Sequence, residues 1–164
     1  MQGQSAGACE RANELNRAFL DSKLKGLIAC SGGDYLIQIL EYIDFNKIKE
    51  NAKWVQGQSD ITNLLYLLTT KYDIATIYSF NVKSFGDKNL PSQMIENNIS
   101  ILKGTLPIQQ EFSKSAIGWI CITPFVPFKG RIIGGCLDSL KDLIGIKYDN
   151  TKEFINKYKN DGIV

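Results

Sequence analysis

The sequence predicts an α/β fold in which a parallel β-sheet is flanked by helices and followed by the start of a second domain. Short apolar segments alternate with segments of helical periodicity in the first half of the chain, which is typical of βαβ units. Glycine-containing loops separate these segments where strands would end. With 164 residues, 44% of them hydrophobic and 22% charged, the chain has the size and composition of about one globular domain.

The N-terminal part contains two predicted helices around a short strand. Residues 8–21 carry apolar side chains at helical spacing, which predicts a helix with one buried face. An apolar strand is expected over residues 24–30, and it ends at a Ser-Gly-Gly turn. Residues 35–42 regain helical spacing, and Asp44 is placed to cap a further short helical turn.

The central part predicts a second strand, a helix and a third strand. Residues 53–56 form the second strand, which ends at Gly57, and Trp54 is expected to lie in the core. Residues 60–71 form a strong helix with a continuous apolar stripe. Residues 74–78 form the third strand. Strands that alternate with helices in this way favour a parallel sheet.

After the third strand the pattern becomes less regular. Residues 79–91 are polar and contain glycine and proline, which predicts a loop. A helix is expected over residues 92–103, with Ser92 as its N-cap and Gly104 as its C-terminal stop. Residues 105–129 place prolines among β-favouring residues, so we expect short strands and a connection there.

Two further helices are predicted near the C-terminal end of the sequence. The first opens at Gly134-Gly135 and runs to Ile144, and the second covers residues 151–159, with one apolar side that includes Ile155. Residues 162–164 have the character of a strand that is just beginning.

Composition excludes several classes of function. Nineteen basic residues against 17 acidic ones give a net charge of +2, which argues against a protein that binds nucleic acid through phosphate contacts. The chain contains no histidine, so it cannot by itself complete a histidine-ligated metal site or a Ser-His-acid triad. We expect neither a metal nor a cofactor.

Features of the sequence also bear on its location. No apolar run approaches the roughly 20 residues that span a bilayer, and the first residues have no apolar signal-peptide core. The four cysteines are widely spaced without a CxxC motif, which indicates free thiols in a reducing compartment. A cytoplasmic location without membrane contact is therefore expected.

The sharpest motif is a Gly-x-Ser turn between a predicted strand and a predicted helix. Gly57 removes a side chain where the turn is crowded, and Ser59 falls where the first helical N–H groups point outward. This arrangement is typical of a nucleophile elbow, although Ile61 stands where a second glycine is usual. The alternative interpretation is that Ser59 simply caps the helix.

A second strand–helix loop, residues 30–35, is expected at the same edge of the sheet. The carboxyl ends of parallel strands lie together, and ligands bind there. Gly32 and Gly33 would allow bare backbone N–H groups to approach a ligand oxygen, unless the loop is an ordinary glycine-rich turn. Cys30 is a poor candidate for a nucleophile because no histidine is available to activate it.

Taken together, these motifs resemble the LD-carboxypeptidase family of serine peptidases. The resemblance rests on residues 10–15, on Gly32-Gly33-Asp34-Tyr35, on residues 57–62, and on Gly134-Gly135-Cys136-Leu137. Residues 130–137 are closer to the microcin-immunity branch of the family. The family fold is an α/β N-terminal domain that carries the serine and a C-terminal domain that carries a glutamate and a histidine.

The resemblance implies a role for particular residues. Ser59 falls on the family's nucleophile, and the backbone N–H of Asp60, with one from Gly32 or Gly33, falls on its oxyanion hole. The implied substrate is a small peptide or peptidyl nucleotide, cleaved at an amide bond of a peptidoglycan peptide or a microcin C-type compound. No metal or cofactor is implied, and no nucleic acid or membrane partner.

The sequence also departs from the family. We find no counterpart of the strand that begins family members, and no carboxylate or histidine at the remaining catalytic positions. Cys136 stands where many relatives have asparagine. We therefore expect residues 1–104 to form the nucleophile-bearing domain without its first strand. Residues 105–164 would form a linker and the beginning of a C-terminal domain, truncated before the glutamate and the histidine.

Two consequences and two alternatives follow from these departures. The chain alone is expected to be inactive, and a homodimer or a separate chain that supplies glutamate and histidine is the expected partner. One alternative is a non-catalytic binding or interaction domain of the same fold. The other is an unrelated domain that holds an anion with the glycine loop. Ser59 and the lack of histidine disfavour an amidotransferase-like domain, and a flavodoxin-like domain would have a stronger phosphate loop than Ser31-Gly32-Gly33.

Overall fold

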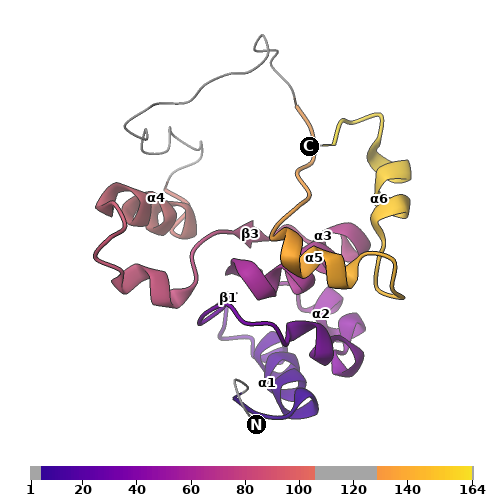
Figure 1. Cartoon of the computed structure of the whole chain (residues 1–164), viewed down its shortest axis with the longest axis horizontal. Coiled ribbons are helices and arrows are strands. Elements are labelled where there is room, and N and C mark those ends of the chain that lie inside the picture. Colours follow the sequence, from indigo (N-terminus) through magenta and orange to yellow (C-terminus); the bar gives the residue numbers. More distant parts are fainter. Residues whose placement is uncertain (1–4, 106–128, 164) are drawn as a thin grey trace.

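The computed structural model describes residues 5–105 and 129–163, and its centre is a three-stranded sheet (Figure 1). The strands are β1 (Gly26–Ile28), β2 (Trp54–Gly57) and β3 (Ile77–Tyr78), in the order β1-β2-β3. Both pairs are parallel, with Leu27 beside Val55 and Gly57 beside Tyr78. The predicted parallel sheet is therefore confirmed, with shorter strands than the sequence pattern indicates.

Helices surround this sheet, and most of them lie where the sequence predicts them. The α-helices are α1 (Ala8–Leu20), α2 (Phe45–Glu50), α3 (Thr62–Tyr72), α4 (Ser92–Leu102), α5 (Leu137–Leu143) and α6 (Thr151–Tyr158). Three 3-10 helices complete the described set: η1 (Leu36–Tyr42), η2 (Ser59–Ile61) and η3 (Val82–Gly86). Local chemistry explains several ends: the Asp44 side chain accepts the Lys47 N–H at the start of α2, and Gly104 ends α4 with φ +67°.

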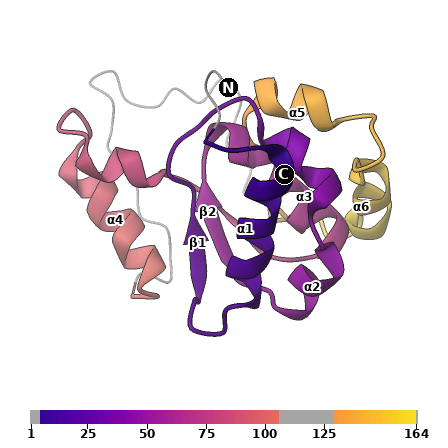
Figure 2. The same ribbon diagram turned by 90° about the horizontal axis from the view of Figure 1, so that it is seen from below.

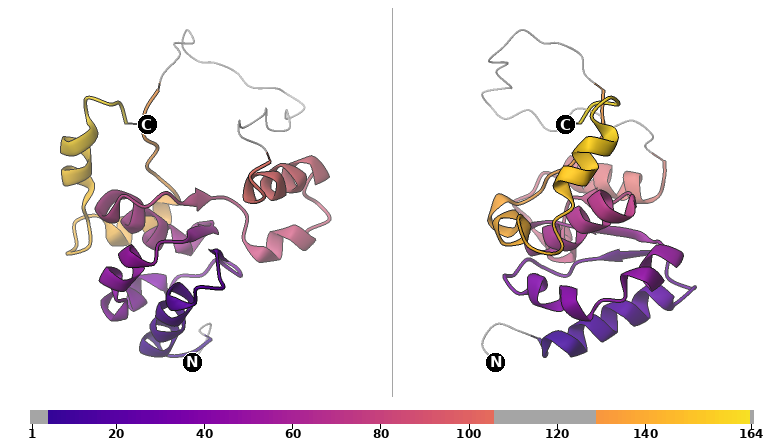
Figure 3. Two further views of the ribbon diagram at one scale, coloured as in Figure 1. Left: turned by 180° about the vertical axis from the view of Figure 1, so that it is seen from behind. Right: turned by 90° about the vertical axis from the view of Figure 1, so that its right-hand side faces the viewer.

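The helices fall on two sides of the sheet. Figure 2 shows α4 on one side and α5 and α6 on the other, and the rear and side views in Figure 3 agree. The core surrounds α3, which buries Leu64, Leu67 and Leu68 completely. From the N-terminal part of the chain, Ala12 and Phe19 of α1 are also buried in this cluster. The helix α3 is buried on almost every side. Its position is therefore fixed by packing, and so is its first turn, which directly follows the predicted elbow.

Several local predictions are wrong in detail. Residues 36–42 form a 3-10 helix, and the predicted loop at 79–91 contains η3. Ser92 does not cap α4, because Pro91 takes the N-cap position. The helix expected from Gly134 begins at Leu137 instead, since Gly134 and Gly135 have positive φ values of 155° and 146°, which a right-handed helix does not contain.

Two side chains expected in the interior are exposed. Trp54, the first residue of β2, is 56% exposed. Ile155 is 42% exposed, while its neighbours Phe154 and Tyr158 on α6 are buried. The apolar side of α6 is therefore narrower than the sequence pattern indicates.

Other expectations fall partly outside the described residues. The short strands predicted over 105–129 lie almost entirely there, and the domain division at residue 104 stays a prediction. Arg131 forms a parallel β-bridge with Ile163, in keeping with the strand character of residues 162–164. Within residues 5–105 and 129–163, no helix has the length and apolarity that a membrane crossing requires. Those same ranges hold no group of three metal-ligating side chains.

Candidate active site

Ser59 lies in a strained turn between β2 and the helix that follows it. Its φ is 69°, in the left-handed region that non-glycine residues rarely occupy, and such a conformation costs about 1–3 kcal/mol. Gly57, two residues earlier, has no space for a side chain. A Cβ there would lie 2.8 Å from atoms of Ala29, Ile61 and Asn81. The strand–turn–helix geometry expected of a nucleophile elbow is therefore present.

Two side chains, one on β3 and one just after it, hold this turn in place. Asn81 is 5% exposed, accepts the Gln58 N–H at 2.9 Å and donates to the Gln58 carbonyl at 3.3 Å. The Tyr78 hydroxyl accepts the Ser59 N–H at 3.4 Å. These contacts hold the two peptides that lead into Ser59, so that the Ser59 conformation is fixed by its surroundings.

The glycine loop lies directly against Ser59. A Cβ on Gly32 would be 3.0 Å from both Cβ and Oγ of Ser59, so the loop backbone and the hydroxyl are in close contact. Ser59 is half-buried, and Gly32 and Gly33 are exposed. Among the described residues the Ser59 hydroxyl makes no hydrogen bond, and no helix-capping bond from its side chain is formed. The capping alternative is therefore not what the structure contains.

The Asp60 carboxylate joins the elbow to the same loop. It accepts the Tyr35 N–H at 3.1 Å and the Leu36 N–H at 3.0 Å. Burial raises the pKa of this carboxyl above its ordinary value, while the two N–H groups oppose the rise. The nearby charges also act in opposite directions, since Asp34 raises the pKa of Asp60 and Arg11 lowers it.

A third segment packs against the first turn of α3. The Cys136 N–H donates to the Thr62 hydroxyl at 3.1 Å. A Cβ on Gly135 would overlap the Thr62 methyl group, and its φ of 146° also favours glycine. The structure thus brings the three sequence motifs, at 32–35, 57–62 and 134–137, to one end of α3.

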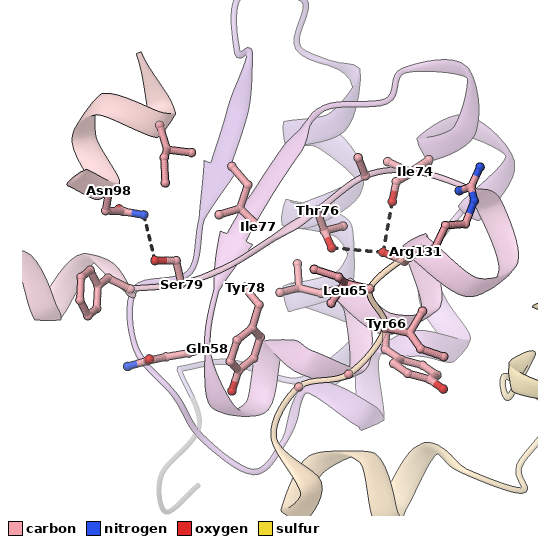
Figure 4. Close-up of a pocket in the computed structure, with 18 of the residues that line it drawn as sticks. Gln58, Leu65, Tyr66, Ile74, Thr76, Ile77, Tyr78, Ser79, Asn98 and Arg131 are labelled. Carbon is pink, nitrogen blue, oxygen red and sulfur yellow. Dashed lines mark hydrogen bonds between the residues drawn. The ribbon is translucent and has the colours of Figure 1, made fainter. Parts of the chain in front are cut away.

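A cavity lies beside the elbow rather than over the hydroxyl. It has a volume of about 1000 Å³ and follows β3 from Gln58 and Tyr78 to Arg131, with Asn98 of α4 on its far wall (Figure 4). Ser59, Gly32 and Gly33 do not line it.

Sequence reasoning missed the side chains that support the turn. Tyr78 and Asn81 come from the segment at and after β3. Their role depends on the strand register, which pairs Gly57 with Tyr78. The available signal was the polar sequence directly after the third strand, because side chains at the carboxyl ends of neighbouring parallel strands meet.

Comparison with known proteins agrees with this architecture. Residues 2–79 match the family described as the LD-carboxypeptidase N-terminal domain. A Vibrio cholerae serotype O1 protein, provisionally named a carboxypeptidase, is 32% identical over 88% of this chain and 49% of its own length. The microcin C7 self-immunity protein MccF of Escherichia coli is 27% identical over 85% of this chain and 47% of its own.

Solved structures give the same result. An MccF-like protein from Bacillus anthracis superposes with a TM-score of 0.72 at 25% identity, over 90% of this chain and 50% of its own. A muramoyltetrapeptide carboxypeptidase from Oxalobacter formigenes, at 22% identity, shares the fold with a TM-score of 0.69, over 88% of this chain and 47% of its own. MccF has also been solved with aspartyl sulfamoyl adenosine and with glutamyl sulfamoyl guanosine.

The similarity covers the serine-bearing part of these proteins. The chain spans about half the length of the relatives that match most of it, at 49% and 47%. The family match includes β1, β2, β3 and the Ser59 turn. Residues 2–79, just under half of this chain, are therefore similar to the N-terminal domain of the LD-carboxypeptidase family.

Proposed function

We propose that this chain supplies the nucleophile of a serine peptidase of the LD-carboxypeptidase type. The reaction is hydrolysis of an amide bond in a muropeptide or in a microcin C-type peptidyl nucleotide. The observation that carries the proposal is the strained Ser59, whose hydroxyl oxygen lies against the glycine loop. A non-glycine residue held at positive φ on a strand–helix turn is typical of a serine presented for attack.

The proposed chemistry begins with attack on the carbonyl carbon of the scissile amide. A C–O bond forms from the Ser59 oxygen, and the hydroxyl proton passes to a general base. The N–H of Asp60, with one from Gly32 or Gly33, stabilises the oxyanion. The C–N bond then breaks, the amine leaves with the proton, and water hydrolyses the serine ester to release the acid.

Two features support the backbone donors. Gly32 and Gly33 have no Cβ, so a substrate oxygen can approach their N–H groups closely. The Asp60 N–H is in the first turn of η2, where N–H groups have no intrahelical acceptor. The Ser59 N–H is occupied by the Tyr78 hydroxyl, which leaves the next peptide as the donor on this side.

The general base comes from outside these 164 residues in this proposal. The chain has no histidine, and a serine hydroxyl is a weak nucleophile near neutral pH without an adjacent base. A further polypeptide segment, or a partner chain, would supply the glutamate and the histidine. The chain alone then retains only the contribution of binding and the oxyanion hole, and its turnover stays far below that of an enzyme.

The substrate proposal rests on the relatives. MccF binds aminoacyl sulfamoyl nucleosides, so an aminoacyl or peptidyl nucleotide is one substrate class for this chain. Muropeptides are the other class, because a muramoyltetrapeptide carboxypeptidase shares the fold. We propose a cytoplasmic location, which the free thiols of Cys9, Cys30 and Cys136 support.

The test is turnover after complementation. The chain is co-expressed with the reading frame adjacent to its gene and assayed with a muropeptide tetrapeptide and with aspartyl sulfamoyl adenosine. We expect turnover that needs both polypeptides and falls by at least about 10³-fold in Ser59→Ala. Ser22→Ala is the matched control, since Ser22 is an exposed serine after α1, outside the Ser59 turn and the glycine loop, and it should retain activity. Equal activity in Ser59→Ala would contradict the proposal.

A binding module of the same fold is the second candidate, and the lack of histidine favours it. Such a module would bind aspartyl sulfamoyl adenosine without cleaving it, whether or not a complementing polypeptide is present. Calorimetric titration of the chain with this compound, followed by product analysis, separates the two functions. Binding without product in the complemented sample identifies the binding module.

A further inference from the structure

The residue after the nucleophile holds the glycine loop through its side chain. The Asp60 oxygen Oδ2 lies 3.1 Å from the Tyr35 nitrogen and 3.0 Å from the Leu36 nitrogen. Oδ1 lies 3.2 Å from the Leu36 nitrogen. Tyr35 is the N-cap residue of η1, so both N–H groups belong to the start of a helix, where they lack helical partners. A carboxylate from a distant part of the chain therefore satisfies them.

Arg11 of α1 holds the same peptide from its other side. Both terminal nitrogens of its guanidinium donate to the Tyr35 carbonyl, each at 3.2 Å, and one also donates to Gln38 at 3.4 Å. The Tyr35 residue is thus bound at its N–H by Asp60 and at its carbonyl by Arg11. Hydrogen bonds in which one partner is charged are stronger than neutral ones.

The contacts made by Asp60 and Arg11 fix how the residues of the glycine loop align with those of the Ser59 turn. Consecutive residues of the elbow face consecutive residues of the loop: Ser59 faces Gly32, and Asp60 faces Gly33. A Cβ on Gly33 would lie 3.3 Å from the Asp60 carboxylate, just as one on Gly32 would lie 3.0 Å from the Ser59 hydroxyl. A shift of the loop relative to Asp60 would therefore change the space between the Ser59 oxygen and the loop N–H groups.

We propose that Asp60 is a positioning residue. Its carboxylate holds the Gly32–Gly33 backbone at the distance from the Ser59 oxygen that oxyanion stabilisation needs. Arg11 is the second anchor of the same loop. The proposal rests on the proposed function, because it assigns the loop N–H groups to the oxyanion. It adds a role for the Asp60 side chain that is separate from that of the Asp60 backbone N–H. Removing the side chain leaves that N–H in the chain.

Amide hydrogen exchange tests the clamp without any turnover. In the full chain, Asp60→Ala should raise exchange at Tyr35 and Leu36 by about tenfold or more, because each N–H loses its acceptor. Asp60→Asn keeps one oxygen that can accept both N–H groups, so its exchange should stay nearer the wild-type value. Asp34→Asn is the matched control, since it removes a neighbouring exposed carboxylate that makes no hydrogen bond within the described residues. Unchanged exchange at both amides in Asp60→Ala, or an equal rise throughout α3, would overturn the proposal.

Kinetics of the complemented enzyme test the consequence for catalysis. We expect Asp60→Ala to lower kcat by about 10²-fold with a much smaller change in KM, and Asp60→Asn to restore part of the loss. A rise in KM alone would contradict a positioning role. If the complemented wild type shows no turnover, the proposed function fails, whereas the exchange experiment still decides whether Asp60 holds the loop.

Discussion

At residue 59 the backbone keeps a conformation that serine adopts only under constraint. The strain costs about 1–3 kcal/mol, and the neighbouring Asn81 and Tyr78 contacts offset it by holding the two peptides that precede the Ser59 Cα. Gly57 provides the space that these contacts need. The same constraint places the hydroxyl at the molecular surface rather than in the core, which is where an attacking oxygen has to be.

Gly32→Ala tests the contact between loop and hydroxyl at this scale. The new methyl group would lie 3.0 Å from the Ser59 Oγ, which is closer than carbon and oxygen normally approach. Because Gly32 is exposed, we expect little change in melting temperature and a fall in kcat of the complemented enzyme of about 10²-fold.

Gly86→Ala is the control for that substitution. Its added methyl group meets no atom within 4 Å, and its residue lies at the end of η3, so both stability and turnover should be unchanged. Wild-type kcat in Gly32→Ala would show that the close contact with Ser59 is not needed for activity.

At the scale of elements, Asp73 at the C-terminal end of α3 connects α3 to the last helix, α6. Asp73 ends α3 in a left-handed conformation with φ 57°, and its carboxylate accepts from Arg131 at 2.8 Å, from Lys157 at 3.4 Å and from the Tyr158 hydroxyl. The Arg131 guanidinium also lies 3.8 Å from the centre of the Tyr158 ring. One side chain thus joins α3, the segment at residue 131 and α6.

Asp73→Asn should reduce stability in a pH-dependent way. The Tyr158 hydroxyl, followed by Arg131 and Lys157, lowers the pKa of Asp73 against an opposing effect of burial. Since the folded chain holds this proton less tightly than the unfolded chain, the carboxylate stabilises the fold above the ordinary aspartate pKa of about 3.9. That contribution disappears as the pH falls through the lowered value.

The measurement is the melting temperature of wild type and Asp73→Asn across the acidic range. We expect the wild type to melt higher near pH 7, and the difference to shrink at pH values below the lowered pKa. The side chain is 42% exposed, so salt should also reduce the difference. Asp138→Asn, at an aspartate that is 93% exposed, should show no such pattern. A difference that is constant across pH would contradict the assigned cause.

Elements stabilised by local chemistry were predictable from the sequence, whereas the surroundings of the site were not. The Asp44 cap and the apolar stripe of α3 depend on neighbours a few residues away, so their patterns predicted them. The predicted burial of Trp54 was wrong, because the exposure of a strand residue depends on what packs against it after folding, which its local sequence does not contain. Tyr78 and Asn81 reach the turn through parallel strand pairing, and sequence spacing contains no information on that register.

For the whole molecule, the sequence predicted where the candidate site lies better than it predicted which side chains hold the site together. Ser59 and the glycine loop were predicted as one site because parallel strands end at one edge of a sheet, and the structure brings them into contact. The clamp by Asp60 and Arg11 was not predicted, since its partners are 24 or 25 residues apart along the chain and meet only after folding.

The identity of the nucleophile can be measured directly on the complemented protein. A fluorophosphonate probe reacts with the activated serine of a hydrolase, and peptide mass spectrometry locates the modified residue. We expect modification of Ser59 in the complemented sample, and none above background in the isolated chain or in Ser59→Ala. Modification of a different serine in a sample that turns over substrate, or equal modification of Ser59 without the complementing polypeptide, would contradict the central claim.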